Sequence, residues 1–170
     1  VSIAPEVLAL AAPAAWRRFD ELVDAKRGHP WHELVSTLLT GAGVGDVAPI
    51  VEWLWSEQPR SNLWRRPIPD MIALARELAA GGCRVAVLSN SEGKLAELLV
   101  EIGLADPFVA IIDSGRVGIE KPDRRIFDHA LELTGAATGI HIGDSWSADV
   151  EGALGAGWRA IWAARRSNWC

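Results

Sequence analysis

Residues 140–158 read IHIGDSWSADVEGALGAGW, a short apolar run followed by a polar turn and a segment with helical spacing. Similar units recur through the second half of the chain. The apolar runs are Arg84–Leu88, Phe108–Ile112, Gly139–Ile142 and Arg159–Trp162, and helices are predicted between them over Gly93–Ile102, Arg124–Leu133 and Ala148–Ala156. Continuously apolar strands are typical of a sheet covered on both faces, and intervening helices are typical of parallel crossovers. The sequence therefore predicts an α/β fold with a doubly wound parallel sheet.

The first part of the chain has a different pattern. The offsets of Trp16, Phe19 and Val23 predict a helix over Pro13–Lys26, and Pro5 with Glu6 resembles a first helical turn. Further helices are predicted over residues 32–39, 47–55 and 69–80. This part also holds five of the nine tryptophans: Trp16, Trp31, Trp53, Trp55 and Trp64. We expect a compact helical subdomain with an aromatic interior over residues 1–68 and an α/β core over residues 69–170.

Composition narrows the class of protein. The 170 residues are 49% hydrophobic and 23% charged, which is typical of a globular chain, and the net charge is −5. Without a compensating basic stripe, this charge argues against nucleic acid as a partner. No apolar run reaches the roughly 18 residues of a membrane span. Two cysteines do not make a disulfide framework, so we expect a cytoplasmic protein with Cys83 as a buried thiol.

Polar side chains follow the predicted strands at their carboxyl ends. Ser89 and Asn90 follow the first strand, Lys121 lies beyond the second, and Asp144 and Asp149 follow the third. Ligands of open parallel sheets bind at this edge. A hydroxyl and an ammonium suit a phosphate group, and paired carboxylates suit Mg²⁺.

Each of these residues also has a structural interpretation. Ser89 and Asp144 are good helix N-caps, and Asp149 would be favoured by the dipole of a first helical turn. Lys121 alone would be read as a solvated loop lysine. The combination at three strand ends, rather than any one residue, indicates a site.

Three segments resemble the second, third and fourth motifs of the haloacid dehalogenase (HAD) superfamily of hydrolases. They are VLSNSEGKL (residues 87–95), DSGRVGIEKPDRRIF (113–127) and residues 140–158. The lysine motif is similar to that of phosphoglycolate-phosphatase-like enzymes and 2-haloacid dehalogenases, which carry a helical cap between their first and second motifs. The resemblance implies a Rossmann-like core with the tryptophan-rich segment as its cap.

The resemblance also implies a role for each site residue. Ser89, helped by Asn90, would hydrogen-bond a phosphoryl oxygen, and Lys121 would neutralise charge during transfer. Asp144 would ligate Mg²⁺ and Asp149 would hold a metal-bound water. Trp146 lies between the two carboxylates and would line the mouth of the site. The expected substrate is a small phosphorylated metabolite.

The first motif of the family, an apolar strand ending in a nucleophilic aspartate, has no counterpart before the helical segment. Asp20 and Asp24 lie in a predicted helix, and Asp113 ends a strand but stands too close to Lys121. The resemblance places that strand in the centre of the sheet, beside the strands that end at Ser89 and Asp144. We therefore expect the natural chain to extend further at its N-terminus, and this chain alone to be impaired.

Two alternatives remain open. A 2-haloacid dehalogenase would act on a halogenated acid without a metal, although the complete Asp144/Asp149 pair favours the phosphatase. A non-catalytic relative or fragment would explain the lack of a nucleophile. Neither the physiological substrate nor the oligomeric state follows from the sequence.

Overall fold

The computed structural model describes residues 2–25, 30–58, 60 and 64–163. They fall into two compact units, one up to residue 61 and one from residue 62 to residue 164. The units divide slightly before the predicted boundary at residue 68. The assignment of the first unit as a cap and the second as a catalytic core remains a prediction.

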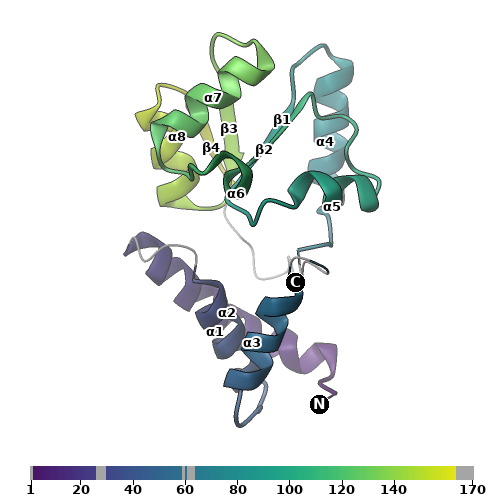
Figure 1. The fold of residues 1–170 in the computed structure, drawn as a ribbon, viewed down its shortest axis with the longest axis vertical. Helices are drawn as coiled ribbons and strands as arrows, with labels where there is room; N and C mark the ends of the chain where they lie inside the picture. The colour runs from purple at the N-terminus through teal and green to yellow at the C-terminus, as the bar shows by residue number, and fades with distance from the viewer. Residues whose placement is uncertain (1, 26–29, 59, 61–63, 164–170) are drawn as a thin grey trace. The chain divides into compact units, whose positions relative to one another are not determined.

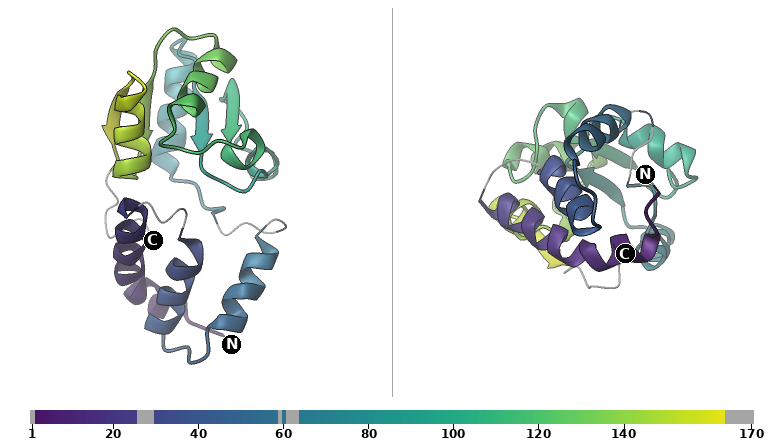
Figure 2. Two further views of the ribbon diagram at one scale, coloured as in Figure 1. Left: turned by 60° about the vertical axis from the view of Figure 1, so that its left-hand side comes forward. Right: turned by 90° about the horizontal axis from the view of Figure 1, so that it is seen from below.

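The first unit consists of the helices α1 (Pro5–Asp24), α2 (Trp31–Gly41) and α3 (Ala48–Glu57), seen in Figures 1 and 2. Helix α1 begins at Pro5 and runs through Pro13, so the predicted start at Pro13 is wrong. The helix start at Pro5 agrees with the first helical turn expected at Pro5 and Glu6, and Pro13 lies inside the helix although proline, which lacks an N–H, is disfavoured there. Alanines surround it, and their high helix propensity supports the longer helix.

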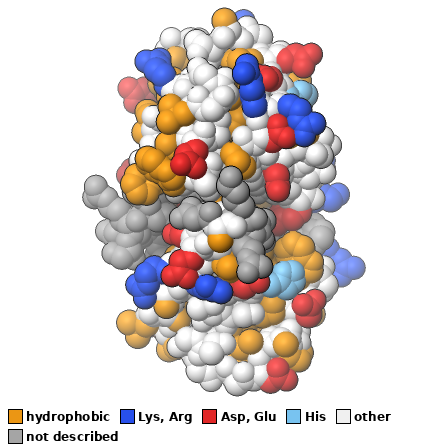
Figure 3. Space-filling model, turned by 90° about the vertical axis from the view of Figure 1, so that its left-hand side faces the viewer, with side chains coloured by type: hydrophobic (Ala, Val, Ile, Leu, Met, Phe, Trp, Pro, Cys, Tyr) orange, Lys and Arg blue, Asp and Glu red, His pale blue; other side chains and the backbone are white. Residues whose placement is uncertain are grey.

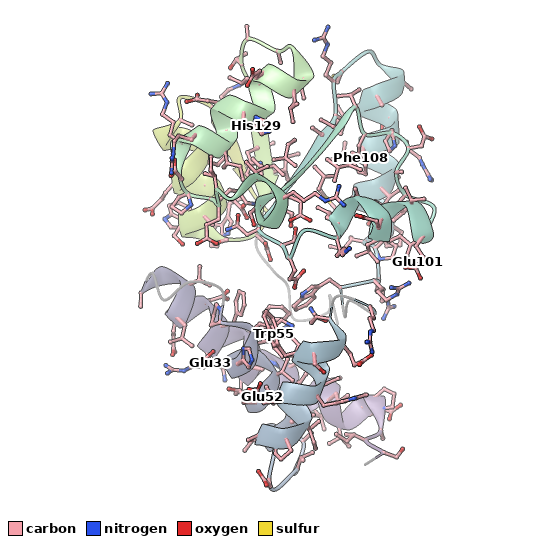
Figure 4. All side chains as sticks on the ribbon, viewed as in Figure 1. Glu33, Glu52, Trp55, Glu101, Phe108 and His129 are labelled. Carbon is pink, nitrogen blue, oxygen red and sulfur yellow. The ribbon has the colours of Figure 1, made fainter. Side chains whose placement is uncertain are left out.

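The interior of the first unit is more aliphatic than predicted. Trp31 is fully buried, and it packs with Val35, Leu39 and Val51. Trp53 and Trp55 lie at the surface of this unit, with exposed fractions of 60% and 39%, while Trp64 belongs to the second unit. Trp55 lies on α3 (Figure 4), and its ring contacts the Trp31 ring with centroids 5.1 Å apart. The expectation of an aromatic interior therefore holds for Trp31 and for Trp16, which packs against buried Phe19, and not for Trp53.

The second unit alternates strands and helices. Its strands are β1 (Ala86–Ser89), β2 (Ala110–Asp113), β3 (Ile140–Gly143) and β4 (Arg159–Trp162). Its helices are α4 (Pro69–Ala80), α5 (Leu95–Glu101), α6 (Ser114–Val117), α7 (Arg124–Thr134), the π-helix η1 (Trp146–Glu151) and α8 (Gly152–Gly155). Helix α4 and strand β4 have the predicted bounds. The helix predicted over Ala148–Ala156 instead begins as η1, and α6 was not predicted.

All strand pairing is parallel, which confirms the predicted fold class. Strand β1 pairs with β2, with Ser89 opposite Asp113, and β3 pairs with β4, with Gly143 opposite Trp162. Within the described residues these are two separate two-stranded sheets, because no ladder joins β1 to β3. The two pairs match the two sides that the resemblance gives to a central strand, and that strand itself remains a prediction.

One hydrophobic core serves both strand pairs. Helix α7 contributes Ile126, Phe127 and Ala130, and β2 contributes Ile112. Partly buried residues of β1, β2 and β4 pack against this cluster: Ala86, Leu88, Ala110 and Ala160. Burial of these apolar side chains holds the two sheets in one unit without a shared ladder.

Two expectations about the surface can be examined directly. Cys83 is exposed, so the prediction of a buried thiol is wrong; it lies in the short connection between α4 and β1 rather than inside the strand. On the face drawn in Figure 3, acidic and basic side chains are interspersed with hydrophobic ones among the described residues. No described helix combines the length and hydropathy needed to cross a membrane.

Candidate active site

Lys121 is the residue around which the predicted site assembles. Its Nζ donates to the backbone oxygen of Leu88 at 2.9 Å and to Asp149 Oδ1 at 2.6 Å. The Lys121 and Asp149 side chains are 9% and 6% exposed. Leu88 immediately precedes Ser89 in β1, while Asp149 follows β3. This one ammonium therefore joins the carboxyl ends of the two strand pairs.

Asp149 accepts hydrogen bonds on both carboxylate oxygens. Oδ1 accepts from Lys121 and lies 3.0 Å from His141 Nε2, and Oδ2 accepts from the Ser145 backbone N–H at 2.9 Å. Burial alone would raise the pKa of Asp149, but the His141 hydrogen bond, the Lys121 charge and the Ser145 N–H together hold it well below its ordinary value. Asp149 is therefore a carboxylate, and His141 Nε2 is the donor in their hydrogen bond.

The local backbone explains how Asp149 reaches this position. Ser145 O accepts from the backbone N–H of Asp149 at 2.9 Å and of Val150 at 3.3 Å, which widens the turn into η1. A Cβ on Gly143 would lie 2.3 Å from Asp149 Oδ2, so only glycine leaves room for the carboxylate. Single π-helical turns occur frequently at functional sites.

Ser89 and Asn90 follow β1 as predicted, but their side chains differ in what they bind. The Ser89 hydroxyl makes no hydrogen bond to the described residues, and its contact with a phosphoryl oxygen stays a prediction. The Asn90 amide makes two hydrogen bonds to the Lys121 backbone, Nδ2 to O at 3.0 Å and Lys121 N to Oδ1 at 2.9 Å. The Asn90 side chain therefore holds the Lys121 backbone. The expected help of the Asn90 backbone or amide at a phosphoryl oxygen stays a prediction.

Asp113 has a structural role. Its carboxylate accepts three backbone hydrogen bonds, from Gly93 at 2.9 Å, Leu95 at 2.9 Å and Gly115 at 3.0 Å. All three of these donors belong to the backbone of the surrounding loops, so the carboxylate fixes those loops, and only 2% of the residue is exposed. Asp20 is exposed on α1, and the side chain of Asp24 lies outside the described residues.

Asp144 and Trp146 lie at the exposed rim of the site. The Asp144 side chain is exposed, and its backbone oxygen accepts from Trp162 Nε1 at 3.1 Å. The rings of Trp146 and Trp162 are nearly perpendicular, with centroids 5.3 Å apart, and these residues are 48% and 53% exposed. The roles of Asp144 in metal binding and of Trp146 at the site mouth remain predictions.

The side chains present fit a magnesium ion that is completed by water and substrate. Within the described residues no group of three or more His, Cys, Asp or Glu side chains forms a metal cage. Mg²⁺ is commonly bound by one or two carboxylates, waters and substrate phosphate, and Asp144 and Asp149 supply hard oxygen donors of this kind.

Sequence reasoning missed His141. Alternation along β3 places its side chain on the same face as Gly143, the residue that lies against Asp149. That alternation, together with a histidine two residues before the glycine, is the signal that could have identified it.

The sequence is similar to a known protein family and to individual members of it. Residues 12–157 match the family model described as haloacid dehalogenase-like hydrolase. The chain is 35% identical over 139 residues to haloacid dehalogenase-like hydrolase domain-containing protein 3 of Bos taurus, covering 79% of this chain and 55% of that protein. It is 35% identical over 165 residues to a phosphoserine phosphatase of Thermus thermophilus, covering 91% of this chain and 64% of the relative. This chain thus spans between half and two thirds of the length of these relatives.

Solved structures give the same fold. A HAD phosphatase from Thermococcus onnurineus matches with a TM-score of 0.57 and 23% identity, covering 95% of this chain and 80% of that one. A dehalogenase captured with an intermediate matches with a TM-score of 0.63 and 18% identity, covering 98% and 76%. At these identities the likeness supports the Rossmann-like α/β fold and does not distinguish the two activities.

Proposed function

The chain belongs to the haloacid dehalogenase-like hydrolases, and from this premise we propose that it carries most of the active site of a magnesium-dependent phosphatase for a small phosphorylated metabolite. The observation that supports this best is the buried Lys121–Asp149 ion pair beside the carboxyl end of β1. A buried ammonium held in this way can neutralise charge that develops on a transferring phosphoryl group. Phosphoserine and glyceraldehyde 3-phosphate phosphatases among the relatives are consistent with it.

Each residue would contribute one function. The Ser89 hydroxyl would donate to a phosphoryl oxygen, and Lys121 would stabilise negative charge from the Leu88 side of the site. Asp144 and Asp149 would hold Mg²⁺, directly or through water. The ion would supply charge neutralisation at the phosphoryl oxygens.

The unpaired edges of β1 and β3 indicate where a strand that carries the nucleophile would pair. Val109 N donates to Val85 O at 2.8 Å, so the backbone groups of Val85 and, by alternation, Val87 face β2. The backbone N–H and C=O groups of Ala86 and Leu88 therefore point to the opposite edge of β1, where Lys121 Nζ donates to Leu88 O.

Strand β3 has the same arrangement. Gly139 and Gly143 accept from residues at and after β4, at 3.1 and 2.8 Å, so Ile140 and Ile142 direct their N–H and C=O groups away from β4. We infer that a further parallel strand, with a nucleophilic aspartate at its carboxyl end, pairs with these inner edges. Its carboxylate would then lie beside Lys121.

A dehalogenase is the second candidate, because dehalogenases are among the solved structures with a similar fold. Halide displacement needs no metal, whereas phosphoryl transfer requires neutralisation of the phosphate charge. The Asp144 and Asp149 carboxylates favour the phosphatase.

We also propose a cytoplasmic location, supported by a chain with only two cysteines.

Hydrolysis of p-nitrophenyl phosphate tests the proposal. The 170-residue chain would be assayed alone and after extension by whatever residues its gene encodes ahead of Val1, each with Mg²⁺ and with EDTA. We expect turnover that requires Mg²⁺ and the extension, and a loss of at least about 100-fold in Lys121→Met. Lys94→Met, at an exposed lysine, is the matched control.

Other results would select the alternatives. Metal-independent release of chloride from 2-chloropropionate, with no phosphatase activity, would identify a dehalogenase. No turnover of either compound by either form would identify a non-catalytic relative.

A further inference from the structure

We propose that His141 is a positioning residue that fixes the Asp149 carboxylate in the orientation needed to bind a divalent cation. The inference deepens the proposed function and rests on it. Its basis is the hydrogen bond of 3.0 Å from His141 Nε2 to Asp149 Oδ1, an oxygen that also accepts from Lys121.

The hydrogen bonds leave one open position on this carboxylate. A carboxylate has about four lone-pair positions, two on each oxygen. Lys121 and His141 occupy both positions on Oδ1, and Ser145 N–H occupies one on Oδ2. The remaining position, on Oδ2, is the one that can face a cation or its bound water.

His141 is itself held by packing. Its side chain is 11% exposed, and its ring meets Phe127 edge to face with centroids 5.6 Å apart. Phe127 is completely buried in the core beneath the strands. A ring fixed in this way acts through Asp149 rather than on a substrate, so its role is to orient the carboxylate.

Without His141, Asp149 would still pair with Lys121 but would lose its second restraint on Oδ1. The carboxylate plane could then tilt away from the Ser145 N–H, so that the direction of the open position on Oδ2 would no longer be fixed. Removal of a hydrogen-bond partner that orients a metal ligand typically costs about 10- to 100-fold in metal affinity.

The exchange rate of the Ser145 amide hydrogen reports the carboxylate orientation without metal or activity. We expect exchange about tenfold faster in His141→Leu than in the wild-type chain, because the amide loses its fixed acceptor. In His141→Gln the side-chain amide can still donate to Oδ1, so the exchange rate should return to near the wild-type value. The Gly93 amide, which donates to Asp113, should be unchanged in every variant.

His129→Leu is the matched control, since His129 lies on α7 (Figure 4), where its Nδ1 is 3.8 Å from Glu132. Unchanged Ser145 exchange in His141→Leu would overturn the proposal. Equal acceleration in the Leu and Gln variants would also overturn it, because loss of packing alone would then account for the effect.

Calorimetric titration with Mg²⁺ alone extends the test to function. We expect affinity about tenfold weaker in His141→Leu and close to wild type in His141→Gln. A wild-type chain that does not bind Mg²⁺ would count against the proposed phosphatase, while the amide exchange would still decide whether His141 positions Asp149. Weakened affinity in the Leu variant that Gln does not restore would contradict the positioning role.

Discussion

The two halves of the second unit each bury one aspartate, and the two carboxylates are held by different kinds of donor. Asp113 and Asp149 are 2% and 4% exposed. Asp113 is held by three backbone N–H groups. Asp149 is held by one backbone N–H and by the side chains of Lys121 and His141. Backbone donors fix a loop, whereas a charged side chain can exchange one partner for a ligand, so the donors rather than the burial separate a structural carboxylate from a functional one.

The largest expected loss of stability follows from replacement of Asp113, the carboxylate held by backbone donors. Asp113→Ala would leave three backbone N–H groups without their acceptor, and we expect a loss of about 4 kcal/mol in the free energy of unfolding. Urea denaturation measures this, and hydrogen exchange should accelerate at Gly93, Leu95 and Gly115. A loss below about 1 kcal/mol would mean that water replaces the carboxylate and that the comparison with Asp149 fails.

Stability should respond differently around Asp149, because both members of its ion pair with Lys121 can be replaced together. Lys121→Met leaves the buried Asp149 charge unpaired and should cost about 3 kcal/mol. Adding Asp149→Asn removes that charge while keeping an acceptor for Ser145 N–H, so the double variant should recover to within about 1 kcal/mol of the wild-type chain.

The double variant should nevertheless be unable to bind Mg²⁺ tightly. Denaturation of the single and double variants, followed by Mg²⁺ titration, checks both statements. If the second substitution adds to the damage instead of relieving it, the ion pair contributes more to stability than its desolvation costs.

Smaller losses of stability are expected when the glycines next to the two carboxylates, Gly115 and Gly143, are replaced by alanine. A Cβ on Gly115 would lie 2.5 Å from the Gly93 backbone nitrogen, whereas the three atoms nearest to a Cβ on Gly143 belong to the Asp149 side chain, with Cγ and Oδ2 at 2.3 Å. Backbone cannot move as easily as a side chain, so Gly115→Ala should cost about 3 kcal/mol, and Gly143→Ala, which displaces a hydrogen-bonded carboxylate, about 2 kcal/mol. Only Gly143→Ala should weaken Mg²⁺ binding. The reverse order of stabilities would show that the loop around Gly93 is the softer of the two regions.

The sequence was most informative where local signals agree with the fold. Pro69 and the glycines after Ala80 define both ends of α4, and the apolar run of β4 was found with its bounds. The positions of Lys121 and Asp149 after neighbouring strands were enough to expect them at one edge of the sheet, because parallel strands bring their carboxyl ends together, and the two residues form an ion pair. The presence of the Ser89 hydroxyl in the same site stays a prediction.

Other features depend on contacts that no local pattern encodes. The π-helical turn at Asp149 and the use of the Asn90 amide by Lys121 both depend on the final packing around the site. The exposure of Trp53 follows from its position on α3, where Val51 is the buried residue.

The common core beneath the two strand pairs has a mechanical consequence. Helix α7 supports both pairs through apolar contacts, and such contacts are non-directional, so small sliding movements break no hydrogen bond. Across the division itself, the long flexible side chain of Lys121 reaches from Leu88 to Asp149. Lys121 therefore links the two strand pairs by directional hydrogen bonds, in addition to the non-directional apolar contacts of α7.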